Sequence, residues 1–153
     1  MSEVLETTAG KLRFRVPTDR LYGSEGIWVL CEEHEGTRRI RLGLSDFLQQ
    51  HSGDAAFVTV KPPGTKVEAG DELAELETIK VTLSLGAPVG GTVVEVNAAL
   101  ESSPEVVNQD PYGEGWLAVI EPASWDADRA KLLEPTAYFA LMQTEIAREL
   151  EKP

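Results

Sequence analysis

One lysine stands out among the residues with usable chemistry, because one strand pattern leads to it and another leads away. Lys80 lies between turn glycines, with Gly70 ten residues before it and Gly91 eleven residues after it. This arrangement predicts a β-hairpin that carries Lys80 at its exposed tip. Such a tip suits a covalently carried cofactor, since a modifying enzyme can reach the amine and the cofactor can swing between partners. An ordinary solvated lysine fits the same pattern.

The other reactive side chains do not form a recognisable active site. His34 and His51 each stand in a polar context without a second ligand at metal spacing, so we expect both to face solvent. Cys31 lies within an apolar run, which predicts a small buried core residue. There is no nucleophile-elbow motif, and Gly86–Gly91 lacks the Lys-Ser/Thr of a phosphate loop. The carboxylates are scattered, and Asp71, Glu72 and Glu75 are expected to be solvated. We therefore assign no catalytic residue and no metal ligand.

The composition bounds the class of protein and its partners. A chain of 153 residues is one domain with its own core. With 14 basic and 26 acidic residues the formal net charge is −12, which argues against binding to nucleic acid or to an anionic membrane surface. No apolar run is long enough to span a membrane, and the N-terminus does not resemble a signal peptide. The single cysteine excludes a disulfide framework, so we expect a cytoplasmic protein.

Short strand patterns separated by turns dominate the chain from residue 21 to residue 120. The connections are too short for βαβ units, so the pattern predicts a mainly β barrel or sandwich. Ser45 is the expected N-cap of one short helix, 46–50. The expected strands cover 27–33, 38–44, 57–60, 73–77, 81–85, 92–97 and 116–120, and residues 98–115 are expected to form a long polar connection.

The two ends of the chain differ from this pattern. Residues 1–20 are expected to form an extension with one short strand, 12–16, ahead of a single domain over 21–153. Near the C-terminus we expect a helix over 126–133 capped by Ser124, then a second capped by Thr136. In the second helix a stripe of apolar side chains should pack against the β body, namely Tyr138, Leu141, Met142, Ile146 and Leu150.

An ordered set of motifs resembles the glycine cleavage system H protein family. The segment Glu77, Thr78, Ile79, Lys80 and Val81 resembles the family's lipoylation site, usually Glu-Ser-Val-Lys-Ala. The resemblance extends from Leu21 to Leu141, and the whole ordered set is far more specific than the lysine motif. Further matching segments are 53–54, 57–58, 63–65, 87–93, 96–97, 103–108 and 112–117.

The resemblance implies a hybrid barrel-sandwich fold with C-terminal helices, and a carrier that is not itself an enzyme. It also implies lipoate in amide linkage to Lys80, which would shuttle an aminomethyl group. The implied partners are a pyridoxal-phosphate glycine decarboxylase, an aminomethyltransferase, a dihydrolipoyl dehydrogenase, and a lipoate ligase or lipoyl transferase. Lipoate is favoured over biotin, because biotinylated hairpins normally place methionines where Ile79 and Val81 stand.

Several positions depart from the family pattern. After Tyr22 the segment Gly23–Trp28 lacks the family's histidine and second glutamate. Thr78 replaces the usual serine and Val81 the usual alanine. These departures leave a second function open, that of an H-like lipoate-binding carrier in a heterodisulfide-reductase-like sulfur oxidation pathway. An enzyme with an unrecognised site and an unmodified binding module are the remaining alternatives, since fold likeness does not define function.

Overall fold

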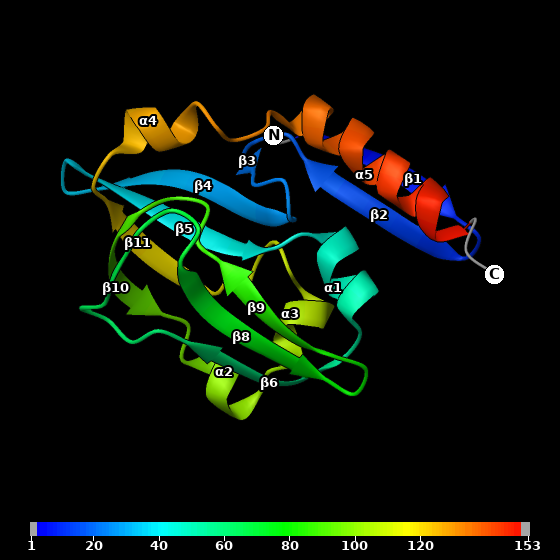
Figure 1. Cartoon of the computed structure of the whole chain (residues 1–153), viewed down its shortest axis with the longest axis horizontal. Coiled ribbons are helices and arrows are strands. Elements are labelled where there is room, and N and C mark those ends of the chain that lie inside the picture. Colours follow the sequence, from blue (N-terminus) through cyan, green and yellow to red (C-terminus); the bar gives the residue numbers. More distant parts are fainter. Residues whose placement is uncertain (1–2, 151–153) are drawn as a thin grey trace.

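The computed structural model describes residues 3–150, which form a mainly β protein with antiparallel sheets (Figure 1). The largest sheet has six strands in the order β3 (Leu21–Tyr22), β4 (Ile27–His34), β5 (Thr37–Leu44), β11 (Ala118–Pro122), β10 (Gly91–Val96) and β7 (Lys66–Val67). The second sheet consists of β6 (Ala55–Val60), β8 (Glu72–Thr78) and β9 (Thr82–Gly86). A hairpin of β1 (Val4–Ala9) and β2 (Leu12–Pro17) forms the third. The helices are α1 (Asp46–Ser52), α2 (Ala99–Ser102), α3 (Val106–Gln109), α4 (Trp125–Arg129) and α5 (Pro135–Leu150).

The main core lies between the six-stranded and three-stranded sheets. In β8 the side chains of Leu73 and Leu76 are buried, whereas Glu75 and Glu77 face solvent. The same core takes in Ile40, Leu42 and Ile120 from the large sheet, among other buried residues. Strand periodicity thus places the apolar side chains of both sheets in one interior, as a sandwich requires. The predicted mainly β barrel-sandwich fold is confirmed.

A second core cluster joins the two ends of the chain. The β1–β2 hairpin lies along α5, and both contact α1 and the start of the large sheet (Figure 1). Within this cluster the rings of Tyr22 and Tyr138 stack with centroids 4.6 Å apart, and Met142 and Ile146 are buried. The predicted packing role of the α5 stripe is confirmed for its three buried residues. The Leu150 side chain lies outside the described part of the chain.

Buried tyrosine hydroxyls also hold this cluster together. The Tyr22 hydroxyl donates to the Pro17 carbonyl at 2.7 Å, and the Tyr138 hydroxyl shares a hydrogen bond of 2.9 Å with Ser45. Tyr112 accepts from the Asp46 amide at 2.9 Å. Burial raises the pKa of Tyr22, Tyr112 and Tyr138 above the usual tyrosine value, so the hydroxyls remain protonated hydrogen-bond donors.

The structure corrects the expected placement of Cys31. Its thiol is exposed, although the residue continues the apolar run of β4. The apolar run predicts a buried strand, and the burial holds only for its first residues, Ile27, Trp28 and Val29. Cys31 lies on the same face of β4 as Ile27 and Val29, which are buried in the main core, but the cover of this face ends at Val29. Cys31 therefore lines a surface pocket together with Val29 and Trp125.

Several element boundaries were also wrong. The extension holds a second strand, β1, which pairs with β2 through all six residues. The connection 98–115 contains two short helices, α2 and α3. The expected helix after Ser124 is present as α4, but it spans Trp125–Arg129 and does not extend to residue 133. Helix α5 begins at Pro135. The Tyr138 amide donates to the Glu134 carbonyl, so the residue before the helix is Glu134 and Thr136 is not the N-cap. Proline is well suited to the first position of a helix because it needs no amide partner there.

Gly70 turns the chain into β8 with a positive φ of 97°. The Asp71 amide closes this turn onto the Glu68 carbonyl at 2.9 Å, and a Cβ at residue 70 would meet no neighbour within 4 Å. We expect Gly70→Val to destabilise the protein by ~1–2 kcal/mol through backbone strain alone. Urea denaturation measures the change, with Ala69→Val as the control at an exposed neighbouring residue. Equal midpoints for the two variants would show that the turn relaxes without cost.

Candidate functional site

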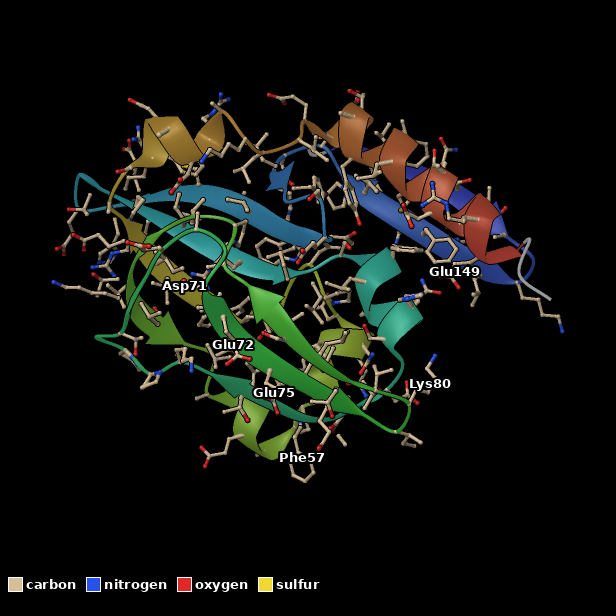
Figure 2. The ribbon with its side chains drawn as sticks, in the orientation of Figure 1. Phe57, Asp71, Glu72, Glu75, Lys80 and Glu149 are labelled. Carbon is tan, nitrogen blue, oxygen red and sulfur yellow. The ribbon has the colours of Figure 1, made fainter. Side chains whose placement is uncertain are left out.

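The β8–β9 hairpin presents Lys80 at its tip, as the sequence predicts. Glu77 pairs with Thr82, and the Thr78 amide donates to the Val81 carbonyl at 2.8 Å, which leaves Ile79 and Lys80 as the loop. Ile79 is 93% exposed, and Lys80 and Val81 are also exposed. Figure 2 shows Lys80 at the end of the hairpin, on the side toward α1.

The Thr78 hydroxyl organises this loop. It accepts hydrogen bonds from the Lys80 amide at 3.2 Å and from the Val81 amide at 3.1 Å. Two-residue hairpin loops normally use turns with positive φ, but Glu35 is the one non-glycine residue with positive φ in the described part of the chain. Since Ile79 and Lys80 do not adopt the usual geometry, the Thr78 side chain supplies local hydrogen bonds in its place.

The sequence resemblance implies lipoylation of Lys80, and on that expectation Thr78→Val should slow the modification several-fold while Thr78→Ser should leave it unchanged. Valine keeps the shape of threonine but removes the oxygen that both loop amides contact, so the loop samples more conformations. The measurement is the time course of modification by a lipoylating enzyme, followed by intact mass. Equal rates for the valine and serine variants would show that the hydroxyl does not position Lys80.

The Lys80 side chain lies across the C-terminal end of α1. Its Nζ donates to the His51 carbonyl at 3.3 Å, one of the last carbonyls of the helix. A Cβ at residue 53 would lie 2.8 Å from Lys80 Cε, so the lysine stem occupies the space above Gly53. Gly53 has φ 93° and ψ −174°, a conformation essentially restricted to glycine. No local pattern indicates that α1 supports Lys80, because the segments are distant in the chain.

Asn108 fixes the backbone beneath Lys80. Its Nδ2 donates to the Gly53 carbonyl at 3.0 Å and to Gln49 Oε1 at 3.1 Å. Its Oδ1 accepts from the Ala55 amide at 2.9 Å, at the start of β6. One side chain of α3 therefore ties α1 to the three-stranded sheet next to the lysine. The family resemblance includes Asn108, but the sequence alone does not reveal this role.

The outer face of the three-stranded sheet beside Lys80 is acidic and contains an exposed aromatic ring. Phe57 on β6 is 66% exposed and pairs with Glu77, while Thr59 pairs with Glu75 (Figure 2). Asp71, Glu72 and Glu75 are exposed, as predicted. Glu72 makes an ion pair of 3.6 Å with Lys61. Phe57, Glu75 and Glu77 offer a partner apolar surface and carboxylates on the half of the sheet nearer the hairpin tip, whereas Asp71 and Glu72 lie toward the base of the hairpin (Figure 2).

The arrangement around Lys80 supports attachment of a group rather than catalysis. The hydrogen-bond partner of Nζ is a backbone carbonyl, which accepts a hydrogen bond but does not exchange protons. His34 and His51 are exposed, as predicted, and the described residues contain no cluster of metal-ligating side chains. Over residues 3–150, the structure has no helix of the length and hydropathy needed to cross a membrane.

Comparisons with known proteins identify the family. A sequence model described as "Glycine cleavage H-protein" matches residues 20–145. The glycine cleavage system H proteins of Beutenbergia cavernae and Thermus thermophilus are 41% and 38% identical over 130 residues, or 85% of this chain and 98% of each relative. The crystal structure of a glycine cleavage system H protein from Mycobacterium marinum aligns with a TM-score of 0.69 at 30% identity, covering 80% of this chain and 95% of that one. The chain therefore belongs to the glycine cleavage H-protein family, whose members are lipoyl carrier subunits and not catalysts.

Proposed function

We propose that this protein carries lipoate in amide linkage to Lys80 Nζ and shuttles an aminomethyl group between the enzymes of glycine cleavage. The observation that carries the proposal is the position of Lys80, which stands exposed at the tip of a two-stranded hairpin inside the family match. When attached, the lipoyl group supplies a dithiolane disulfide that is reduced as it accepts the aminomethyl group and is later reoxidised.

The residues around Lys80 fit such an attachment. Acylation of Nζ removes the positive charge but leaves one N–H, which can still donate to the His51 carbonyl 3.3 Å away. Gly53 leaves room for the lysine stem, and a side chain there would crowd Cε. Glu77, Thr78, Ile79 and Val81 form the hairpin that a modifying enzyme would contact, and Thr78 holds the loop in shape.

The proposed partners are a pyridoxal-phosphate glycine decarboxylase, an aminomethyltransferase and a dihydrolipoyl dehydrogenase. Each must bind this protein with Lys80 directed into its own active site, where tethering raises the local concentration of the reacting group. The acidic face with Phe57, Glu75 and Glu77 is suited to basic entrances on these enzymes. A cytoplasmic lipoate ligase or lipoyl transferase would attach the cofactor.

We also propose that residues 1–20 extend a carrier domain formed by 21–153.

A second candidate is the H-like carrier of a sulfur oxidation pathway. The segment after Tyr22 departs from the family pattern, and Gly23, Ser24 and Glu25 line a surface cavity of about 230 Å³. Pro88 and Gly86 line the same cavity, near the base of the hairpin. A different lining there would favour a different cargo, although the relatives named above favour glycine cleavage.

Mass spectrometry tests the attachment, and a transfer assay tests the cargo. We expect one lipoyl increment in the intact mass after expression with lipoate and a lipoylating system, and peptide mapping should place it on Lys80. Incubation with the decarboxylase and glycine should then load an aminomethyl group. An unmodified chain, beside an H protein modified in the same cells, would reject the carrier role; a modified chain that the decarboxylase leaves unloaded would favour the sulfur carrier.

A further inference from the structure

The exposed aromatic ring of Phe57 is placed by an irregularity in β6. Ala55 and Val58 both contact the main core, although side chains three residues apart point to opposite faces of a regular strand. The pairing with β8 explains this spacing, because its register shifts between Ala55 and Phe57 and leaves Ala56 as the extra residue of a β-bulge. In a regular strand Phe57 would face the core with Ala55. The bulge therefore directs the ring to solvent, where it is 66% exposed.

The backbone on both sides of this bulge is held in place. Before it, the Ala55 amide donates to Asn108 Oδ1 at 2.9 Å. After it, Val58 pairs with the buried Leu76 of β8, so the rest of β6 keeps its core contacts. β-Bulges that re-aim a side chain are over-represented next to functional sites. A fixed bulge that turns a large apolar ring away from the core thus indicates a use for the ring on the surface.

Phe57 lies in the row of outward side chains nearest the hairpin tip. It pairs with Glu77 on β8, and Glu77 pairs with Thr82 on β9. The next contact toward the tip, between Thr78 and the residue after Lys80, closes the loop that carries the amine. Figure 2 shows Phe57 and Lys80 on the half of the sheet that ends in this tip. A protein that reaches Lys80 across the outer face of the sheet therefore meets the Phe57 ring as well.

The carboxylates beside Phe57 indicate the chemistry of such a partner. Glu75 and Glu77 are exposed. Among the described residues, neither has a basic side chain within ion-pair distance. Aromatic side chains are frequent anchors of protein interfaces, and unpaired carboxylates favour a basic rim on the opposite surface. The surface around Phe57 therefore fits an apolar pocket bordered by lysine or arginine.

We propose that Phe57 anchors the enzyme that acylates Lys80, by inserting its ring into an apolar pocket with a basic rim on that enzyme. The proposal rests on the proposed function, because it requires lipoylation of Lys80. In that step Nζ loses a proton, attacks the activated carboxyl carbon of lipoate, forms the amide and expels the activating group. The lipoylating enzyme must therefore bring its acyl donor to Nζ itself, beside the row that contains Phe57. The enzymes that act on the dithiolane meet the far end of an extended arm, so they need not approach the tip as closely.

Steady-state kinetics of lipoylation test the anchor. We expect Phe57→Ala to raise the KM for this protein ~10-fold and to leave kcat unchanged, because the ring contributes to binding and not to acyl transfer. Phe57→Leu keeps an apolar side chain and should recover most of the loss. Val4→Ala, at a residue 49% exposed on the N-terminal hairpin, should change neither constant. An unchanged KM for Phe57→Ala overturns the anchor alone, whereas an original chain that the enzyme cannot modify overturns the proposed function as well.

A small acylating reagent separates docking from a change in the loop. The N-hydroxysuccinimide ester of acetic acid needs no protein surface, and peptide mapping by mass spectrometry follows acetylation of Lys80. We expect the same rate in the original chain and in Phe57→Ala, because the ring lies on β6, outside the loop. Slower acetylation of the variant would place its effect in the loop and would overturn the anchor.

The charge beside Phe57 gives a second kinetic test. Glu75→Gln is compared with Glu95→Gln, at an exposed glutamate of β10 in the other sheet, so that each variant loses one negative charge. We expect Glu75→Gln to raise KM several-fold at low ionic strength, with the difference disappearing at high salt, and Glu95→Gln to have no effect. Equal effects of the two variants would reflect net charge alone and would overturn the basic rim.

Discussion

Lys80→Arg should abolish lipoylation completely and leave the stability of the fold unchanged. Arginine retains the positive charge and can still donate to the His51 carbonyl, so the contact with α1 survives. Its guanidinium stays protonated and is not acylated, so no amide forms. Because the residue is exposed, the free energy of unfolding should change by no more than ~0.5 kcal/mol. The loss of aminomethyl transfer should be total, since the variant provides no attachment point.

The matched control for this variant is Lys66→Arg. Lys66 is also exposed and lies on β7, away from the hairpin tip. We expect full lipoylation of Lys66→Arg by intact mass and no lipoylation of Lys80→Arg under the same conditions. Thermal unfolding of both variants checks that each is folded. A lipoyl increment in the Lys80→Arg protein would place the attachment at another lysine and would refute the assignment of the site.

The hairpin and the exposure of Lys80 could be predicted because the information is local. Alternating residues define β8 and β9, and Gly70 marks the turn that begins β8. The support beneath Lys80 could not be predicted in this way. His51, Gly53 and Asn108 come from separate segments, and only the tertiary fold brings them together. A glycine that is required by contact with a distant side chain has no local sequence signature.

The errors at Cys31 and β1 have a related physical cause. An apolar run predicts burial, but how far along a strand its faces are covered depends on the layers that pack on the sheet. Cys31 shares a face of β4 with the buried Ile27 and Val29 but lies beyond the end of the core that covers them, so it is exposed. The sequence of β1, Val-Leu-Glu-Thr-Thr-Ala, has weak alternation and becomes a strand by pairing with β2 beside α5.

Gly43→Ala is expected to destabilise the fold strongly. Gly43 pairs directly with Trp28 across β4 and β5, and the indole lies over it. A Cβ at residue 43 would overlap Trp28 Cζ2 and would stand 2.6 Å from Nε1. The ring cannot move freely, because Trp28 is fully buried and its Nε1 donates to the Pro111 carbonyl at 2.9 Å. Overpacking together with a lost buried hydrogen bond should cost about 3 kcal/mol.

Two comparisons separate this clash from a general effect of removing a strand glycine. Gly86→Ala in β9 should change stability by no more than ~0.5 kcal/mol, because its nearest contact would be an ordinary 3.4 Å. Trp28→Phe removes the indole atoms that the new Cβ would meet, so adding Gly43→Ala to that variant should cost much less than in the original chain. Urea denaturation of the four proteins in this cycle gives the coupling energy. Strictly additive effects would show that the backbone of β5, and not the indole, accounts for the loss of stability. The contact with Trp28 would then not limit which residue fits at position 43.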